Sequence, residues 1–473
     1  MMMNKPKYDI TRYLCAAAEI GPKFRTKVFD QIIDNTIRYV APSYGVDVPL
    51  VARHCIRGQI RDFIIETLLS IVLVWTLFSS FNSYGIIGGI FRFLLTLFTY
   101  PWLIAIILKW SNLYLGYKTV AKDLKEFDKK GDNRSLIEAQ YEERIKELEE
   151  LQEGNVVYYS GYNPFVGSGN QVDGWSFVCS TKLKEGLESD PNNLSLYALY
   201  DLIDRNMNSL KIPNLTVRDK LFVNGREIRE DARFLPNLYE SPISHVAESL
   251  VDEFKEKWEE NVRYYQTVQV VGWQGNIVFS SFFRITKNEK HLFVEANYFA
   301  VPPLKSQFYE IDQLSSSIPF GRVMKMGVVS IIPAILQLPL SPFRAIKYGM
   351  AFLKGQKNKK ELLQQVDINQ KFDYGAYESI REMAARTDMQ YFFQTTDLMM
   401  YKKEIERCFT DSIVEYLEST GIDTSEFIQR KESIINQGIM INGGQVNGNV
   451  VSVGSIKNNI INQAKNTFQN SNV

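Results

Sequence analysis

The chain has 473 residues and equal numbers of acidic and basic side chains, 54 of each, so its formal net charge is zero. This balance argues against a general nucleic-acid binder, and we expect no nucleic-acid partner. The 29 Phe, 25 Tyr and 6 Trp exceed what a disordered adaptor carries, and the length suits two or three domains. The four cysteines are far apart and form no CxxC pair, which suits reduced thiols and gives no zinc spacing.

Two apolar runs dominate the first quarter of the chain. Residues 1–60 have helix-like periodicity and predict a small helical domain. Phe63–Phe81 and Phe93–Leu108 then follow, separated by a short connector, and each approaches the roughly 20 apolar residues of a membrane-spanning helix. We predict a transmembrane hairpin over residues 61–117, with the lipid bilayer as its partner. A hairpin that dips into one leaflet and a buried helical pair in a soluble core are the alternatives.

Charged residues at the ends of the hairpin predict its topology. Basic residues flank both outer ends, namely Arg53, His54, Arg57 and Arg61 before it and Lys118, Lys122 and Lys125 after it. The positive-inside rule then places both termini in the cytoplasm of a multi-pass protein of the inner, cytoplasmic membrane. Glu66 and Arg92 are the ionisable residues nearest the hydrocarbon, and such residues are candidates for function. Snorkelling toward the interface is the simpler interpretation of both.

The pattern after the hairpin changes from helical to extended. Residues 118–154 are highly charged and predict a spacer helix, with a short coiled coil as the alternative. Val262–Val271, Asn276–Ile285 and His291–Ala300 read as three strands joined by short turns, which predicts an antiparallel meander. We therefore predict a cytosolic α+β domain, with an antiparallel sheet, over residues 155–315.

Residues 316–360 combine apolar and basic side chains. Met326–Leu340 is cut by Pro333 and Pro339, so we expect it to be too short and too broken for a normal span. The basic residues beyond it sit at the edge of an apolar face and are candidates for contact with an anionic membrane surface: Arg344, Lys347 and Lys354. A helix packed on the α+β domain explains the same pattern equally well.

The C-terminal part contains a helical region at residues 361–436 and a Gly/Asn-rich tail at residues 437–473. The tail alternates aliphatic residues with Asn, Gly and Gln and carries almost no charge. It would gain most by pairing with another chain, so we predict self-association through it, with disorder as the alternative.

No motif for catalysis or for a cofactor stands out. The loop with Gly161, Gly167, Ser168 and Gly169 resembles phosphate-binding loops in composition only, and a tight loop between two strands is the preferred interpretation. His245, Glu248 and Asp252 fall on one helix face, which an amphipathic surface helix explains better than a metal site. The chain has only three His residues. We assign no catalytic residue, cofactor or metal.

Several blocks of sequence together resemble a known family. They are TRYLCAAAEI, SGYNPFVGSG with DGWSFV, LFVEANYFAVPP, and the ending GIDTSEF…INQG…INGGQVNG. The resemblance is to an uncharacterised family of bacterial membrane proteins from actinobacteria and cyanobacteria, and it spans nearly the whole chain. It implies no activity and no residue roles. The Gly/Asn-rich ending is similar to C-terminal tags on bacterial signalling and conflict-system proteins.

These observations favour a membrane-anchored, cytosol-facing sensor or scaffold whose α+β domain binds a ligand or a protein partner. A membrane-perturbing effector that forms pores or remodels the bilayer is the first alternative. A membrane-bound hydrolase is the second, and the absence of a catalytic motif makes an enzyme the less favoured interpretation. The ligand, the trigger and the oligomeric number stay open.

Overall fold

The computed structural model describes residues 9–81, 88, 90, 100–121, 140–185, 194–313, 320–436, 440–442 and 445–447. The chain folds into two compact units, each assembled from three segments. Unit 1 comprises Met1–Gly167, Val223–His245 and Leu304–Ala385, and unit 2 comprises Ser168–Phe222, Val246–Pro303 and Arg386–Val473. Arg92 with its connector, much of the predicted spacer helix and most of the tail lie outside the described residues.

Unit 1 is mainly helical. Its first elements are α1 (Ile10–Ile20), α2 (Pro22–Val28), a π-helical turn (Phe29–Ile33) and the 34-residue helix α3 (Val48–Phe81). The others are α5 (Tyr100–Thr119), α7 (Glu142–Gln152), α10 (Phe320–Gln337), α11 (Ser341–Ile368) and α12 (Ile380–Ala384). The apolar run after residue 62 therefore continues a helix that already began at Val48, within the predicted N-terminal domain.

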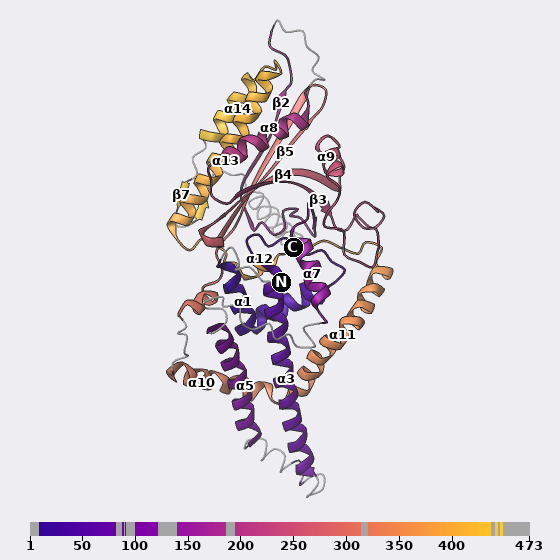
Figure 1. The fold of residues 1–473 in the computed structure, drawn as a ribbon, viewed down its shortest axis with the longest axis vertical. Helices are drawn as coiled ribbons and strands as arrows, with labels where there is room; N and C mark the ends of the chain where they lie inside the picture. The colour runs from indigo at the N-terminus through magenta and orange to yellow at the C-terminus, as the bar shows by residue number, and fades with distance from the viewer. Residues whose placement is uncertain are drawn as a thin grey trace, which may run out of the picture. The chain divides into compact units, whose positions relative to one another are not determined.

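The helices α3, α5 and α10 share one apolar core. Figure 1 draws α3 and α5 side by side, and the hydroxyl of Tyr100 donates a hydrogen bond to Thr76 Oγ1 at 3.1 Å. In addition, α10 contacts α5, and α11 contacts α3. The buried members of this core are Ile65, Leu69, Ala105, Ala334 and Leu338.

The expectation that Pro333 interrupts the apolar run Met326–Leu340 is wrong. Pro333 lies inside α10, which continues to Gln337 and ends two residues before Pro339. Proline removes one helical hydrogen bond. Met326, Ser330 and Ala334 recur every four residues on the buried side of α10, and their packing outweighs that loss.

Two helices in the described part of the chain are long and apolar enough to cross a membrane: Val48–Ser80 and Phe320–Gln337. The first contains the first run of the predicted hairpin. The second is α10, which lies outside the predicted hairpin. In the second run of that hairpin, Phe93–Leu108, residues 93–99 are not among the described residues. By length and composition these two helices could span a membrane, and they fix no topology.

The strands form a six-stranded sheet in the order β1-β3-β4-β5-β6-β2. Their bounds are Val156–Tyr159 for β1, Asn170–Ser180 for β2, Leu215–Asn224 for β3, Val262–Gly272 for β4, Ile277–Lys287 for β5 and His291–Val301 for β6. β4 and β5 pair antiparallel, with Val271 opposite Val278, as do β5 and β6, with Ser280 opposite Phe299. The predicted meander is confirmed within two residues at each end.

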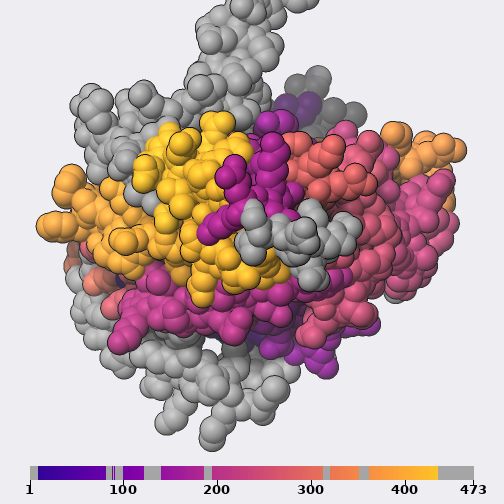
Figure 2. Space-filling model, turned by 90° about the horizontal axis from the view of Figure 1, so that it is seen from above, coloured from indigo at the N-terminus to yellow at the C-terminus, as the bar shows by residue number. Residues whose placement is uncertain are grey.

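Helices accompany the strands in unit 2: α8 (Leu196–Ser209), α9 (Glu248–Glu256), α13 (Phe392–Ser419) and α14 (Ser425–Asn436). Aromatic rings join the last two to the sheet, since Phe409 of α13 stacks on Phe283 at 3.9 Å and Phe427 of α14 meets Phe177 edge-on at 5.2 Å. Figure 2 shows both helices, in orange to yellow, at the molecular surface. Short strands β7 (Met440–Asn442) and β8 (Gln445–Asn447) pair antiparallel.

Candidate functional site

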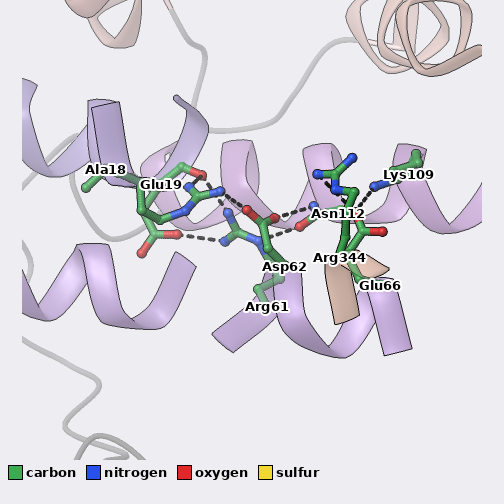
Figure 3. A network of polar contacts seen from close by, with 9 residues as sticks. Ala18, Glu19, Arg61, Asp62, Glu66, Lys109, Asn112 and Arg344 are labelled. Carbon is green, nitrogen blue, oxygen red and sulfur yellow. Dashed lines mark hydrogen bonds and ion pairs between the residues drawn. The ribbon is translucent and has the colours of Figure 1, made fainter. Parts of the chain in front are cut away.

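Polar side chains of the unit 1 helices form two sets of contacts (Figure 3). Glu19, Arg25, Arg61, Asp62 and Asn112 make up the first set, and Glu66, Lys109 and Arg344 make up the second. Asp62 and Glu66 are four residues apart on α3, so both point to one face of that helix. Lys109 and Asn112 share a face of α5 for the same reason, with a spacing of three. Because α3 and α5 pack against each other, the two polar faces meet inside an otherwise apolar helix pair.

Glu19 of α1 anchors one end of the first set. Its buried carboxylate accepts a hydrogen bond from Arg61 Nη1 at 2.7 Å and contacts His54 Nδ1 at 2.9 Å. Burial by itself raises the pKa of Glu19, but the hydrogen bonds and charges of His54 and Arg61 outweigh it and lower the pKa to about 2. Glu19 is therefore ionised at neutral pH and fixes α1 against α3.

Asp62 and Asn112 belong to the same set. Asp62 Oδ2 accepts from Arg25 of α2, and Oδ1 accepts from Asn112 Nδ2 at 2.8 Å. The Asn112 carbonyl in turn accepts from Arg61 Nε at 2.8 Å. The amide thus links the Asp62 pair to the Glu19 pair and brings α5 into the same network.

Two glycines leave room for these arginines. A Cβ at Gly58 would lie 2.7 Å from Arg25 Cδ, and one at Gly116 would lie 3.1 Å from Arg61 Nη2. Both positions are helical, where glycine costs roughly 1 kcal/mol relative to alanine. Their small size is what lets the two guanidinium groups enter the interface.

Glu66 is the centre of the second set, and two cations share its carboxylate. Lys109 Nζ lies 2.5 Å and Arg344 Nη2 lies 3.2 Å from the same oxygen, Oε1. Glu66 is 1% exposed, so its carboxylate does not reach solvent by snorkelling. The second oxygen, Oε2, has no hydrogen-bond partner among the described residues. The local charge is therefore one carboxylate against two cations.

The helices around Glu66 expose large apolar side chains. On α3 these are Ile64, Leu68, Ile71, Val74, Trp75, Leu77 and Phe78, and on α5 they are Tyr100, Leu103, Ile107 and Leu115. On α10, α11 and their junction they are Phe320, Met324, Val328, Val329, Ile331, Ile332, Leu336, Leu340, Phe343, Ile346 and Met350. We call this set the apolar helix surface. Soluble monomers seldom expose a contiguous apolar patch of more than a few hundred Å².

The predicted membrane-surface and intramembrane residues have different positions. Glu66 and Arg344, which the sequence treated as separate candidates, contact each other. Lys347 is exposed on α11. Arg92 and the side chain of Lys354 lie outside the part of the chain that the structure describes.

The glycine-rich loop has the geometry of a tight connection. Gly167 has a φ of 92°, and its N–H donates to both carboxylate oxygens of Glu382 at 3.1 Å, so a phosphate would have to displace that side chain. A Cβ at Gly169 would lie 2.3 Å from the Ala300 carbonyl oxygen. Ser168 is buried, and Gly161, at a φ of 84°, faces open space.

The predicted metal alternative gains no support from geometry. Among the described residues, no group of three His, Cys, Asp or Glu side chains is arranged to hold a metal ion. Asp252 instead pairs with Lys255 Nζ at 2.8 Å.

Sequence reasoning did not find most of the polar network. Glu19, Arg25, Asp62, Lys109 and Asn112 were not singled out, and Arg61 was counted only as a flanking charge. One signal in the sequence indicates the network. Charged or amide residues stand three or four residues apart within apolar helices, as Asp62 and Glu66 do. Their partners are far away in the chain, so only the fold identifies the pairs.

Unit 2 contains a second buried charge cluster. Lys402 of α13 lies 2.5 Å from Asp173 of β2 and 3.4 Å from Glu406 of its own helix. Trp175 Nε1 donates to Glu406 at 2.8 Å, and the Lys402 ammonium lies 5.1 Å from the centre of the Tyr298 ring. These contacts join α13 to the sheet.

Unit 2 also exposes an aromatic patch at the β4–β5 turn and the start of α13, made of Trp273, Tyr391, Phe392, Phe393 and Met400. Trp273 has a φ of 53°, which is unusual for a bulky residue. It is held there by a hydrogen bond from its Nε1 to Asp397 at 2.9 Å and by stacking on Tyr391 at 6.3 Å. This strained turn presents the aromatic side chain at the surface.

The fold thus combines a helical unit that has exposed apolar helices with a unit built on an antiparallel meander. A family model described as an AbeC-like domain matches residues 174–450, more than half of the chain. The chain therefore belongs to the AbeC-like domain family. No curated protein and no solved structure matched it. The resemblance noted from the sequence blocks is confirmed as far as membership of a family is concerned, whereas the bacterial source and the C-terminal tag stay predictions.

Proposed function

We propose that the protein is a membrane-anchored, cytosol-facing scaffold or sensor. Unit 1 anchors the chain in the bilayer, and unit 2 binds a protein partner. The observation that carries this proposal is the apolar helix surface, which lies on the same helices that bury the Glu66 ion pairs.

The ion pairs support the anchoring role. A charged side chain at the bilayer centre is costly, and the charged groups of membrane helices face one another or the protein interior. Glu66 and Lys109 follow this rule, since they meet between α3 and α5, while Ile71, Trp75 and Phe78 face outward. Large apolar side chains thus face outward while the charged pair faces inward, which is the arrangement expected in lipid.

The aromatic patch supports the binding role. The cores of protein interfaces are enriched in Trp, Tyr, Phe and Met and depleted in charge. Trp273, Tyr391, Phe392, Phe393 and Met400 have this composition. A protein partner of unit 2 is therefore the occupant we favour for this patch.

Vesicle flotation with a leakage assay tests the proposal. The full-length protein is reconstituted with dye-loaded phosphatidylcholine vesicles, and we expect it to float with them while the dye stays inside. Failure to float would contradict the anchor. Release of the dye would contradict the scaffold and favour the pore-forming alternative.

A further inference from the structure

All charged residues are basic in the segment that comprises α10 and the first 20 residues of α11. Residues 320–360 contain no Asp or Glu and eight Lys or Arg: Arg322, Lys325, Arg344, Lys347, Lys354, Lys357, Lys359 and Lys360. The same segment supplies much of the apolar helix surface. Basic residues beside exposed apolar residues are typical of helices that lie at an anionic membrane surface.

One of these cations lies at a corner where positive charge is in excess. Arg344 is at the start of α11, and the carboxylate that it contacts, Glu66, is also bound to Lys109. Among the described residues, Asp62, which lies one turn before Glu66 on α3, has its own cation, because it pairs with Arg25. Within the described part of the chain, the contacts of Glu66 therefore bring two positive charges to one carboxylate, an excess of one positive charge.

Apolar side chains flank this corner on both sides. Leu340 and Phe343 precede Arg344, and Ile346 follows it, and all three are more than half exposed. The Arg344 side chain itself is 32% exposed, so it is accessible although it contacts Glu66. In a membrane-anchored protein such flanking residues place the corner where acyl chains meet headgroups. The anion at that depth is the lipid phosphate.

We propose that the corner between α10 and α11 binds the phosphate of an anionic lipid headgroup through Arg344. The inference rests on the proposed membrane anchoring and adds the class of lipid that the anchor prefers. A guanidinium group carries five N–H donors in a planar fork that matches phosphate oxygens. The Glu66 carboxylate competes with the lipid phosphate for Arg344, but Lys109 also neutralises this carboxylate, so positive charge remains at Arg344.

Lipid binding to the full-length protein in mild detergent tests the proposal. The protein is titrated with phosphatidylglycerol or phosphatidylcholine of equal chain length, and bound lipid is counted by native mass spectrometry. The wild type should prefer phosphatidylglycerol. Arg344→Gln should weaken that binding about fivefold, the effect of one basic residue near an anionic surface, and leave phosphatidylcholine unchanged.

Two further variants separate a binding site from a fold element. Lys371→Gln removes the same charge from an exposed position and should bind like the wild type. Glu66→Gln removes the competing carboxylate and should strengthen phosphatidylglycerol binding. Unchanged binding by Arg344→Gln, an equal loss in Lys371→Gln, or a loss in Glu66→Gln would each overturn the proposal.

A competition experiment distinguishes the lipid from a free anion. Inorganic phosphate at the concentration of the lipid should not displace phosphatidylglycerol, because the apolar flanks contribute to binding. Displacement would overturn the assignment to a lipid. If vesicle flotation succeeds but the two lipids bind equally, the headgroup site is wrong and the anchor stands; failure of flotation contradicts the anchor itself.

Discussion

Unit 1 and unit 2 each bury charged side chains, and their clusters are partnered differently. In unit 2, Lys402 lies between two carboxylates, and its ammonium is 5.1 Å from the centre of the Tyr298 ring. In unit 1, Glu66 faces two cations, one of which reaches the surface at Arg344. The two clusters therefore have opposite imbalances, with one cation between two carboxylates in unit 2 and two cations on one carboxylate in unit 1. The excess positive charge of unit 1 is the feature on which the proposed lipid site depends.

Replacing Glu19 should have the largest effect on unit 1. Glu19→Ala leaves Arg61 and His54 without their carboxylate, and breaking a buried pair costs about 3–5 kcal/mol. Hydrogen exchange should show faster exchange of the α1 and α3 amides, with the unit 2 amides as internal reference. Glu149→Ala, at an exposed position on α7, is the control and should change exchange little. Equal exchange in both variants would show that the network does not hold α1 in place.

Replacing Lys402 should affect unit 2 in the same way and leave unit 1 unchanged. Lys402→Met leaves Asp173 and Glu406 without their cation, which we expect to cost about 3 kcal/mol. The β2 and α13 amides should then exchange faster, and adding Glu406→Gln should restore part of the loss. The neighbouring exposed residue provides the control, Lys403→Met. An equal increase in exchange rate in both units would contradict the claim that the two clusters stabilise their units separately.

Lowering the pH should destabilise the Glu19 contact less than Glu19→Ala does, because protonation removes the charge of Glu19 but keeps its side chain. Its pKa falls from 4.5 to about 2 on folding. A lowered pKa contributes stability above the unfolded value, and this is lost as pH falls from about 4.5 toward 2. The free energy of opening, measured by hydrogen exchange at the amides of α1 and α3, should therefore decrease across this pH range in the wild type. It should decrease less steeply in Glu19→Gln. Parallel curves would contradict the assignment.

The smallest effect belongs to an ion pair near the surface of unit 1. Arg53 donates to both carboxylate oxygens of Glu142 at 2.8 Å, and both side chains are partly exposed. Arg53→Met should cost about 1 kcal/mol or less, since exposed pairs contribute little. Thermal unfolding at low and high salt measures it, and a loss as large as that of Glu19→Ala would remove the distinction between buried and surface pairs.

The sequence predicted the elements of the fold better than its contacts. The β4–β6 meander follows from alternating residues and short turns, which are local signals. The contacts of Arg53 and Arg61 could not be predicted this way. Both were counted as flanking charges that set the membrane orientation, yet they pair with Glu142 and Glu19. Arg344 and Glu66 are likewise brought together only by the packing of α11 on α3.

Lysine substitutions on the outer face of α3 test the membrane anchor most directly. Ile71, Trp75 and Phe78 are each more than half exposed. In a soluble protein, Lys at such positions changes stability by about 0.5 kcal/mol or less, whereas in a bilayer each costs up to about 3 kcal/mol.

The measurement is the fraction of full-length protein that stays in bacterial membranes after an alkaline carbonate wash. We predict that the wild type stays and that the variant with Ile71→Lys, Trp75→Lys and Phe78→Lys is released. A control with Lys at the exposed residues Tyr162 and Trp258 should stay. Release of the wild type, or retention of the α3 variant, would contradict the account.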